Sequence, residues 1–126
     1  MMILCPHFLI DIMKNLVIIG AGGMGRTIFD VARESIGYGI EYTIKGFIDD
    51  NLSALDGFED YPPMLGTISH YLPEVDDVFT FSIGGESRRV CIEYLMERNA
   101  KFINIVHSTA RIGSNVRMGE GNVIGA

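Results

Sequence analysis

The apolar and polar positions in the first part of the chain follow two patterns in turn, one typical of strands and one typical of helices. Residues 16–19 form a short uninterrupted apolar run, which is typical of a strand buried on both faces. A helix is predicted from about Arg26, because apolar residues then recur at three- and four-residue spacing. These positions are Ile28, Val31, Ala32 and Ile36. Gly37 and Gly39 end the helix, and residues 42–48 alternate as a second strand that ends at Asp49–Asp50.

The second part of the chain repeats this order of elements. After Pro62–Pro63 breaks the chain, residues 64–67 predict a short strand and residues 68–72 a single helical turn. Residues 78–83 predict a further strand, which ends in Gly84–Gly85. An amphipathic helix follows, with one apolar stripe made of Val90, Cys91, Tyr94 and Leu95. Residues 102–106 predict the last strand, so strands and helices alternate as in an α/β fold with a parallel sheet.

The first glycine cluster has the pattern G-x-G-x-x-G and joins the first strand to the first helix. Glycines allow a tight turn, and they let a phosphate approach the N–H groups at the start of a helix, where the dipole favours an anion. An acid that ends the second strand can accept hydrogen bonds from a ribose or a base edge. The whole order of strand, turn, helix, strand and acid favours nucleotide binding over a tight turn without a ligand.

A second glycine turn is expected to face the same crevice, because ligands of open α/β sheets bind at the carboxyl ends of the strands. Gly84–Gly85 ends the later strand, and Arg88 and Arg89 open the helix after it, either to reach a phosphate or simply to be solvated. The candidate binding residues are therefore Gly20, Gly22, Gly23, Met24, Gly25, Asp49, Asp50, Gly84, Gly85 and Arg88. Residues 14–106 contain one mononucleotide-binding half, whereas a dehydrogenase uses two, so a dinucleotide oxidoreductase is disfavoured.

The last segment changes to a period of six residues. Val106, Ile112, Met118 and Ile124 stand six apart, and glycine follows the last three of them at positions 113, 119 and 125. This is the hexapeptide repeat of a parallel β-helix, whose apolar positions stack into the core. Residues 107–126 supply about one coil, and repeats of this kind need neighbours to bury their faces. The chain is therefore expected to be the front part of a longer protein.

Composition and charge exclude several classes of function. The chain has 126 residues, enough for one domain of ordinary size. Its 16 acidic and 10 basic residues give a net charge of −6, so it lacks the cationic surplus on which nucleic-acid binding and attraction to anionic membranes depend. Residues 1–13 are largely apolar but lack the features of a secretory signal and are too short to span a bilayer. They are interpreted as an extension ahead of a start at Met13.

Cysteines and histidines predict neither a disulfide framework nor a metal site. Cys5 and Cys91 form no C-x-x-C pair, and Cys91 is expected to be a buried, inert thiol. The histidines at 7, 70 and 107 stand apart from the cysteines and from each other, so no zinc site can be written. The expected compartment is the cytoplasm.

The combination of a half-Rossmann unit with hexapeptide repeats resembles one family of sugar acyltransferases. These are the enzymes of the sialic acid O-acetyltransferase type (NeuD-like), which include N-acetyltransferases acting on UDP-linked amino sugars. Four stretches carry the resemblance in order: residues 18–26 (IIGAGGMGR), 47–50 (FIDD), 82–85 (SIGG) and 103–113 (INIVHSTARIG). The predicted fold is thus an α/β, half-Rossmann-like parallel sheet with flanking helices, followed by the start of a left-handed parallel β-helix.

The resemblance also implies a site, a cosubstrate and an assembly. The nucleotide-sugar would be held by Gly22, Gly23, Met24, Asp49, Asp50 and Gly84, although some members carry histidine where this chain has Met24. The β-helix of such proteins forms a homotrimer and binds acetyl-CoA between subunits. A histidine of a later coil is the general base, so these 126 residues alone are expected to be inactive, and His107 is assigned a surface or capping role.

Two functions of different classes remain open at this point. One is the substrate-binding domain and first β-helix coil of an acetyltransferase that modifies a sialic acid or a nucleotide-linked amino sugar at oxygen or nitrogen. The other is a non-catalytic nucleotide-binding or regulatory module. The three expected parts are an extension over residues 1–13, a nucleotide-sugar-binding domain over 14–106 and a β-helix coil over 107–126.

Overall fold

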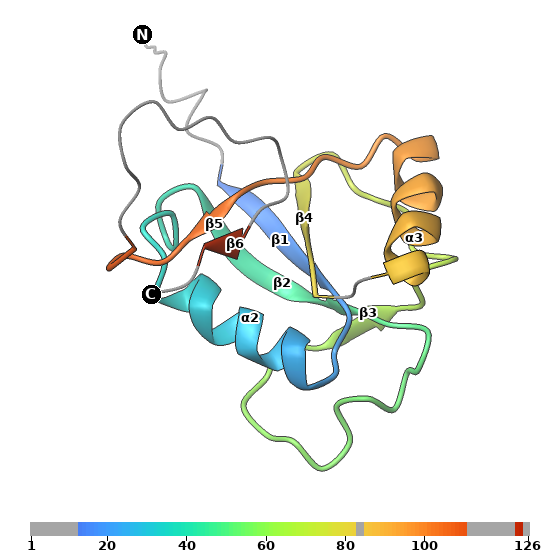
Figure 1. Cartoon of the computed structure of the whole chain (residues 1–126), viewed down its shortest axis with the longest axis horizontal. Helices are drawn as coiled ribbons and strands as arrows, with labels where there is room; N and C mark the ends of the chain where they lie inside the picture. Colours follow the sequence, from blue (N-terminus) through green and yellow to red (C-terminus); the bar gives the residue numbers. More distant parts are fainter. Residues whose placement is uncertain (1–12, 83–84, 111–122, 125–126) are drawn as a thin grey trace, which may run out of the picture.

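The computed structural model describes residues 13–82, 85–110 and 123–124. The helices and strands, in chain order, are β1 (Lys14–Ile19), α2 (Gly23–Arg33), β2 (Tyr42–Ile48), β3 (Met64–Gly66), β4 (Asp77–Phe81), α3 (Gly85–Glu97), β5 (Ile105–Val106) and β6 (Val123–Ile124). Figure 1 shows a parallel sheet with a helix on either side of it. The predicted extension over residues 1–13 lies, apart from Met13, outside the described residues.

Four parallel strands form the main sheet in the order β3-β2-β1-β4. β1 lies in the interior of this order, and its apolar run from Leu16 to Ile19 is completely buried, as expected for a strand covered on both faces. Beyond β4, Phe102 forms an isolated parallel bridge with Phe79. The α/β class, the parallel sheet and the half-Rossmann order of elements are therefore confirmed.

The two faces of the sheet bury two separate apolar clusters. Leu16 and Ile18 of β1 pack with α2 residues such as Phe29 on one face. Val17 and Ile19 pack with Cys91 and Leu95 of α3 on the other. Because successive side chains of a strand point to opposite faces, one apolar run supplies both clusters.

The first helix begins and ends about three residues earlier than its apolar spacing predicts. α2 begins at Gly23 and ends at Arg33, and Ile36 is 63% exposed instead of lying on the buried helix face. The segment after the helix pairs with the end of the domain: the Ile36 N–H donates to the Val106 carbonyl at 3.1 Å, and Ser35 bridges His107. These tertiary hydrogen bonds replace a further helical turn, so Gly37 and Gly39 do not end the helix.

The predicted apolar stripe of the second helix is half correct. Cys91 and Leu95 of α3 are buried, whereas Val90 and Tyr94 are 49% and 42% exposed. Positions 91 and 95 lie one helical turn apart and face the sheet, and their neighbours at 90 and 94 are turned toward solvent. The thiol of Cys91 is buried as expected, and burial raises its pKa.

The predicted strand over residues 102–106 is also shorter in the structure. Only Ile105–Val106 forms a strand, β5, and it pairs in parallel with β6 instead of extending the main sheet. Ile105 pairs with Val123 and Val106 with Ile124, 18 positions later in the chain. Most of the hexapeptide repeat (residues 111–122) lies outside the described residues, and no β-helix is visible in the part of residues 107–126 that is described.

Candidate functional site

The candidate site lies at the carboxyl end of β1, where the strand order reverses. β1 is bonded to β2 on one side and to β4 on the other, so the connections that leave β1 and β4 diverge from this point. In open α/β sheets such a switch point forms the ligand crevice. The structure therefore places the first glycine loop, the acids after β2 and Ser82 after β4 at one edge of the sheet.

Two glycines shape the loop between β1 and α2. Gly20 has a φ of +100°, a conformation that side-chain-bearing residues rarely adopt. A β-carbon on Gly25 would lie 2.0 Å from the Gly20 carbonyl oxygen, so Gly25 allows the helix to pack on the loop. At Gly22, by contrast, an added β-carbon would meet no atom within 4 Å. The loop is therefore tightly packed against the protein at Gly25 and has free space around it at Gly22.

The start of α2 has the features of an anion site. Gly22 is the N-cap and supplies no side-chain hydrogen bond, and the first turn contains no acidic residue. The N–H groups of a first helical turn lack intrahelical acceptors, and the helix dipole adds partial positive charge there. Gly23 and the 62%-exposed Met24 leave this turn open to solvent. A phosphate group can satisfy these donors.

The two acids after β2 both accept backbone hydrogen bonds. Asp49 accepts from the Ala21 N–H and from the Asn51 N–H, each at 2.8 Å. Asp50 accepts from the Ile68 N–H at 3.0 Å through its Oδ1. The acids therefore join the first glycine loop and the turn after β3 to the end of β2, a use that their position in the sequence does not predict.

Ser82 is a residue of this edge that the sequence reasoning missed. Its hydroxyl lies 2.7 Å from the Ile19 carbonyl oxygen and 3.1 Å from that of Gly20, so it donates to the backbone where β1 ends. The only available signal was a polar residue placed between an apolar strand and a glycine pair. Its partner lies 62 residues away in the chain, beyond the reach of local pattern.

Arg26, in the first turns of α2, lies against the glycine loop. Its guanidinium donates to the Ala21 carbonyl at 3.1 Å and stacks on the Phe58 ring, 3.8 Å from the ring centroid. Phe58 in turn contacts Tyr61, with 6.5 Å between the ring centroids. The loop between β2 and β3 therefore reaches the start of α2. A side-chain cation lies there beside the candidate phosphate position.

The second glycine turn is described only in part. Gly84 lies outside the described residues, and Gly85 is the first residue of α3. Arg88 is exposed, with its guanidinium 5.1 Å from the centroid of the Phe81 ring at the end of β4. Contact of Gly84, Gly85 or Arg88 with a phosphate stays a prediction.

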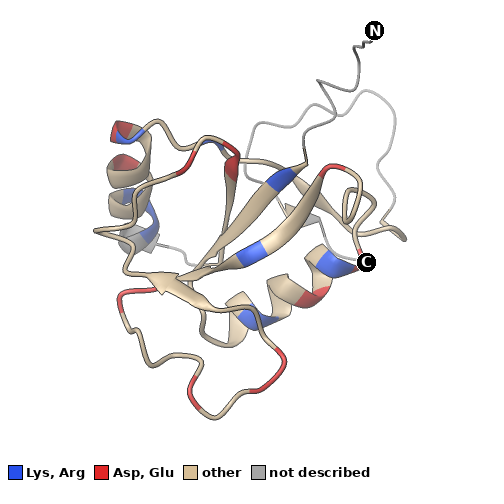
Figure 2. Cartoon of the chain, turned by 180° about the vertical axis from the view of Figure 1, so that it is seen from behind, with Lys and Arg blue, Asp and Glu red and all other residues tan. Residues whose placement is uncertain are grey.

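Acidic residues dominate the connection between β2 and β3. Figure 2 shows red segments spread along this loop, which contains Asp49, Asp50, Asp56, Glu59 and Asp60 and no lysine or arginine. A surface of this charge repels a nucleic-acid backbone. Positive potential for a ligand phosphate must therefore come from the start of α2 and from arginines outside the loop.

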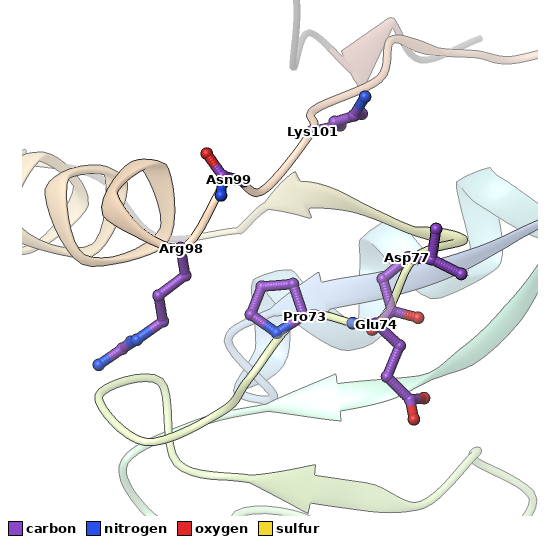
Figure 3. A pocket seen from close by; sticks show the side chains of 7 residues that line it. Pro73, Glu74, Asp77, Arg98, Asn99 and Lys101 are labelled. Carbon is purple, nitrogen blue, oxygen red and sulfur yellow. Dashed lines mark hydrogen bonds between the residues drawn. The ribbon is translucent and has the colours of Figure 1, made fainter.

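A cavity of about 420 Å³ lies elsewhere, at the amino end of β4. Asp77 and Glu74 line it together with Asn99 and Lys101, and Figure 3 shows the Arg98 guanidinium turned away from both acids. Arg98 instead donates to the Ser69 carbonyl at 2.6 Å. The cavity is at the opposite end of the sheet from the glycine loop, and its carboxylates make it a poor phosphate site, so we assign the candidate site to the glycine loop.

A partly buried ionic cluster borders this cavity. Lys45 forms ion pairs with Asp77 and Glu74, and the Tyr71 hydroxyl donates to Asp77 at 2.5 Å. Lys45 lies where the β1–β2 register shifts, since Leu16 pairs with residue 44 and Val17 with residue 46. Burial lowers the pKa of Lys45, but its hydrogen bonds outweigh this effect and raise it. Burial and the bond to Asp77 raise the pKa of Tyr71 to about 12. We interpret the cluster as structural.

Neither a metal-binding group nor a membrane-spanning helix is found among the described residues. Within residues 13–82, 85–110 and 123–124, no group of three histidine, cysteine or acidic side chains is arranged to hold a metal ion. No helix in this described part is long and apolar enough to span a membrane.

Comparison with known proteins places this chain in a family. The family described as the PglD N-terminal domain matches residues 15–95, which include nearly all of β1, all elements from α2 to β4 and most of α3. The chain is also 30% identical over 117 residues to the UDP-N-acetylbacillosamine N-acetyltransferase of Bacillus subtilis (strain 168). That alignment covers 89% of the chain and 51% of the relative, so the chain spans about half the length of the relative. The chain belongs to the PglD N-terminal domain family, the N-terminal portion of the NeuD-like and UDP-amino-sugar acetyltransferases.

Proposed function

We propose that this chain is the nucleotide-sugar-binding part of an acetyltransferase that modifies an amino sugar. The observation that carries the proposal is the open, uncapped start of α2 behind the glycine loop, at the point where the strand order reverses. The similarity to an N-acetyltransferase of a UDP-linked sugar supports the same class of ligand.

The ligand phosphates would bind at the N–H groups of Gly22, Gly23, Met24 and Gly25. Arg26 stands beside this turn, and Arg88 is exposed near the end of β4. Asp50 is exposed at the end of β2, where a carboxylate can accept hydrogen bonds from ribose hydroxyls. A single mononucleotide-binding half suits a nucleoside diphosphate sugar better than a dinucleotide.

We also propose that residues 107–126 begin a left-handed β-helix that follows a domain formed by residues 14–106. The parallel pairing of β5 with β6 supports this, because its offset of 18 residues equals three hexapeptides, the length of one triangular coil. His107 lies at the junction and contacts Glu34 of the first domain, with 2.7 Å between its Nε2 and Glu34 Oε1. This contact supports a structural role for His107.

Acetyl-CoA would be used by the longer, homotrimeric protein. The described residues of the repeat provide only the two-residue pair of β5 and β6, which is too small a surface to hold this cosubstrate. We therefore propose no catalytic step within this chain. The general base and the acetyl-CoA site are proposed to lie in further coils. The alternative to an amino sugar as the acceptor of the acetyl group is a sialic acid.

Isothermal titration of the chain with UDP, CMP and NAD tests the proposed ligand class. We expect a pyrimidine nucleotide to bind more tightly than NAD, because only one mononucleotide half is available. Tight NAD binding without a response to UDP or CMP would contradict the proposal.

A further inference from the structure

The two adjacent acids after β2 make different contacts at the candidate site. Both carboxylate oxygens of Asp49 accept backbone N–H groups, one from Ala21 in the glycine loop and one from Asn51, each at 2.8 Å. Such charge-assisted bonds are among the stronger ones in proteins. Asp49 is also half-buried, and its own N–H donates to the Gly66 carbonyl at 3.1 Å. Its carboxylate is thus directed at the protein backbone.

The bond from Asp49 continues the pairing of β1 with β2 beyond the end of the strands. The Gly20 N–H donates to the Ile48 carbonyl at 2.8 Å, and the next N–H, that of Ala21, donates to the Asp49 side chain. On the opposite side, the Ser82 hydroxyl holds the carbonyls of Ile19 and Gly20. The glycine loop is therefore held by residues that follow β2 and β4. It is held just before the open first turn of α2.

Asp50 makes one such bond only. Its Oδ1 accepts the Ile68 N–H at 3.0 Å, while its Oδ2 has no hydrogen-bond partner within the described residues. The residue is exposed. One oxygen of Asp50 is therefore available to a ligand hydroxyl.

We propose that Asp49 is a positioning residue, which holds the glycine loop in its phosphate-binding shape, and that Asp50 alone of the two acids contacts the nucleoside. This division rests on the proposed function. It departs from the usual role of an acid at this place in a dinucleotide-binding fold, where the carboxylate binds the ribose directly.

Asp49→Asn and Asp50→Asn form a matched pair for the test. Asparagine keeps the size of the side chain but offers one acceptor oxygen instead of two, so Asp49→Asn must leave either Ala21 or Asn51 without its acceptor. Asp50→Asn can keep its bond to Ile68 through the remaining oxygen. At 13.9 kDa the chain is well suited to NMR titration of the labelled protein with inorganic pyrophosphate, uridine and UDP.

Asp49→Asn is expected to lower the affinity for pyrophosphate and for UDP by about tenfold or more and to leave uridine binding nearly unchanged. Asp50→Asn is expected to weaken uridine and UDP while pyrophosphate binding is retained. Without any ligand, hydrogen exchange of the Ala21 or the Asn51 amide should accelerate in Asp49→Asn and not in Asp50→Asn, because only the first variant removes an acceptor from one of these two amides.

Three outcomes would overturn the inference. Asp49→Asn could weaken uridine while pyrophosphate binding is kept, which would make Asp49 a direct nucleoside contact. It could instead weaken all three ligands together with a loss of thermal stability, which would make its role merely structural. Unchanged exchange at both Ala21 and Asn51 would remove the physical basis of the inference. Failure of the unmodified chain to bind any of the three ligands would instead reject the proposed function.

Discussion

The carbonyl oxygen of Gly20 occupies the space that a β-carbon on Gly25 would require, since the two atoms would lie 2.0 Å apart. This carbonyl cannot easily turn away, because the Ser82 hydroxyl donates to it at 3.1 Å. The third glycine of the motif is therefore required by the packing of α2 on its own loop. This requirement exists before any ligand binds.

Gly25→Ala is accordingly expected to lower the free energy of unfolding by about 1–3 kcal/mol, the usual range for an overpacked site. Urea denaturation monitored by circular dichroism would measure the change. Gly22→Ala is the matched control, because Gly22 has an ordinary φ of −75° and open space around its Cα. Equal stability of the two variants would contradict the close contact at Gly25.

Gly22→Val is expected to abolish nucleotide binding with little loss of stability. The branched side chain meets no protein atom near its β-carbon, but it would fill the space through which a phosphate reaches the start of α2. Titration with UDP and a thermal melt on the same sample would measure both effects. Unchanged affinity in this variant would move the phosphate site away from the glycine loop.

Ser82→Ala is expected to cost about 1 kcal/mol of stability, the typical net contribution of one hydrogen bond. It should also weaken UDP binding, because the Ile19 and Gly20 carbonyls would lose a partner that holds the loop. Ser53→Ala, in the exposed loop after β2, is the control and should change neither quantity. If the two serine variants behave alike, Ser82 has no role in shaping the loop.

The raised pKa of Tyr71 predicts that the folded chain loses stability in alkali. This pKa is raised to about 12 in the folded chain, whereas an unfolded tyrosine ionises near pH 10. Between these values the unfolded state binds fewer protons, so the stability contributed below pH 10 is lost as the pH rises toward 12. The raised pKa of Lys45 acts in the same direction.

Tyr71→Phe should therefore show a smaller decrease of unfolding free energy between pH 10 and pH 12 than the parent chain. Urea denaturation at a series of pH values would measure it. Tyr38→Phe, at a position 43% exposed, controls for removal of a tyrosine as such. A parallel decrease in the parent chain and in Tyr71→Phe would show that the bond from Tyr71 to Asp77 does not couple to folding.

The 126-residue chain is expected to transfer no acetyl group by itself. The general base and the acetyl-CoA site are proposed to lie in further coils, and positioning of base and acceptor accounts for much of the rate of such reactions. A thiol-release assay with acetyl-CoA and either an amino-sugar nucleotide or a sialic acid would measure transfer. Turnover by this chain would show that the active site is misplaced, and His107 would be the first residue to replace.

A longer protein with further hexapeptide coils is expected to form a trimer and to be active. Replacement of the histidine in a later coil by alanine should then abolish turnover and leave nucleotide binding intact. Sedimentation analysis and the same assay test both statements. An active monomer would argue against an acetyl-CoA site between subunits.

The local pattern of the sequence was sufficient to predict those elements whose apolar run is buried along its whole length. The apolar run of β1 predicts a strand covered on both faces, and the glycines after it predict a tight turn before a helix. These features could be inferred because a buried strand needs an unbroken apolar run and a sharp turn needs residues without a β-carbon. The acids after β2 could also be placed at the correct edge of the sheet, because the carboxyl ends of parallel strands lie together.

The tertiary structure alone decided where elements stop and what the polar side chains bind. α2 ends before Ile36 because the chain there pairs with Val106, about 70 residues later. Asp49 binds Ala21 and Ser82 binds Gly20 through contacts between different strands. The spacing of apolar residues along the sequence indicates only whether a position faces the core. The partner of a polar group depends on which distant backbone atoms the fold brings within 3 Å or so of it, and no local pattern encodes that.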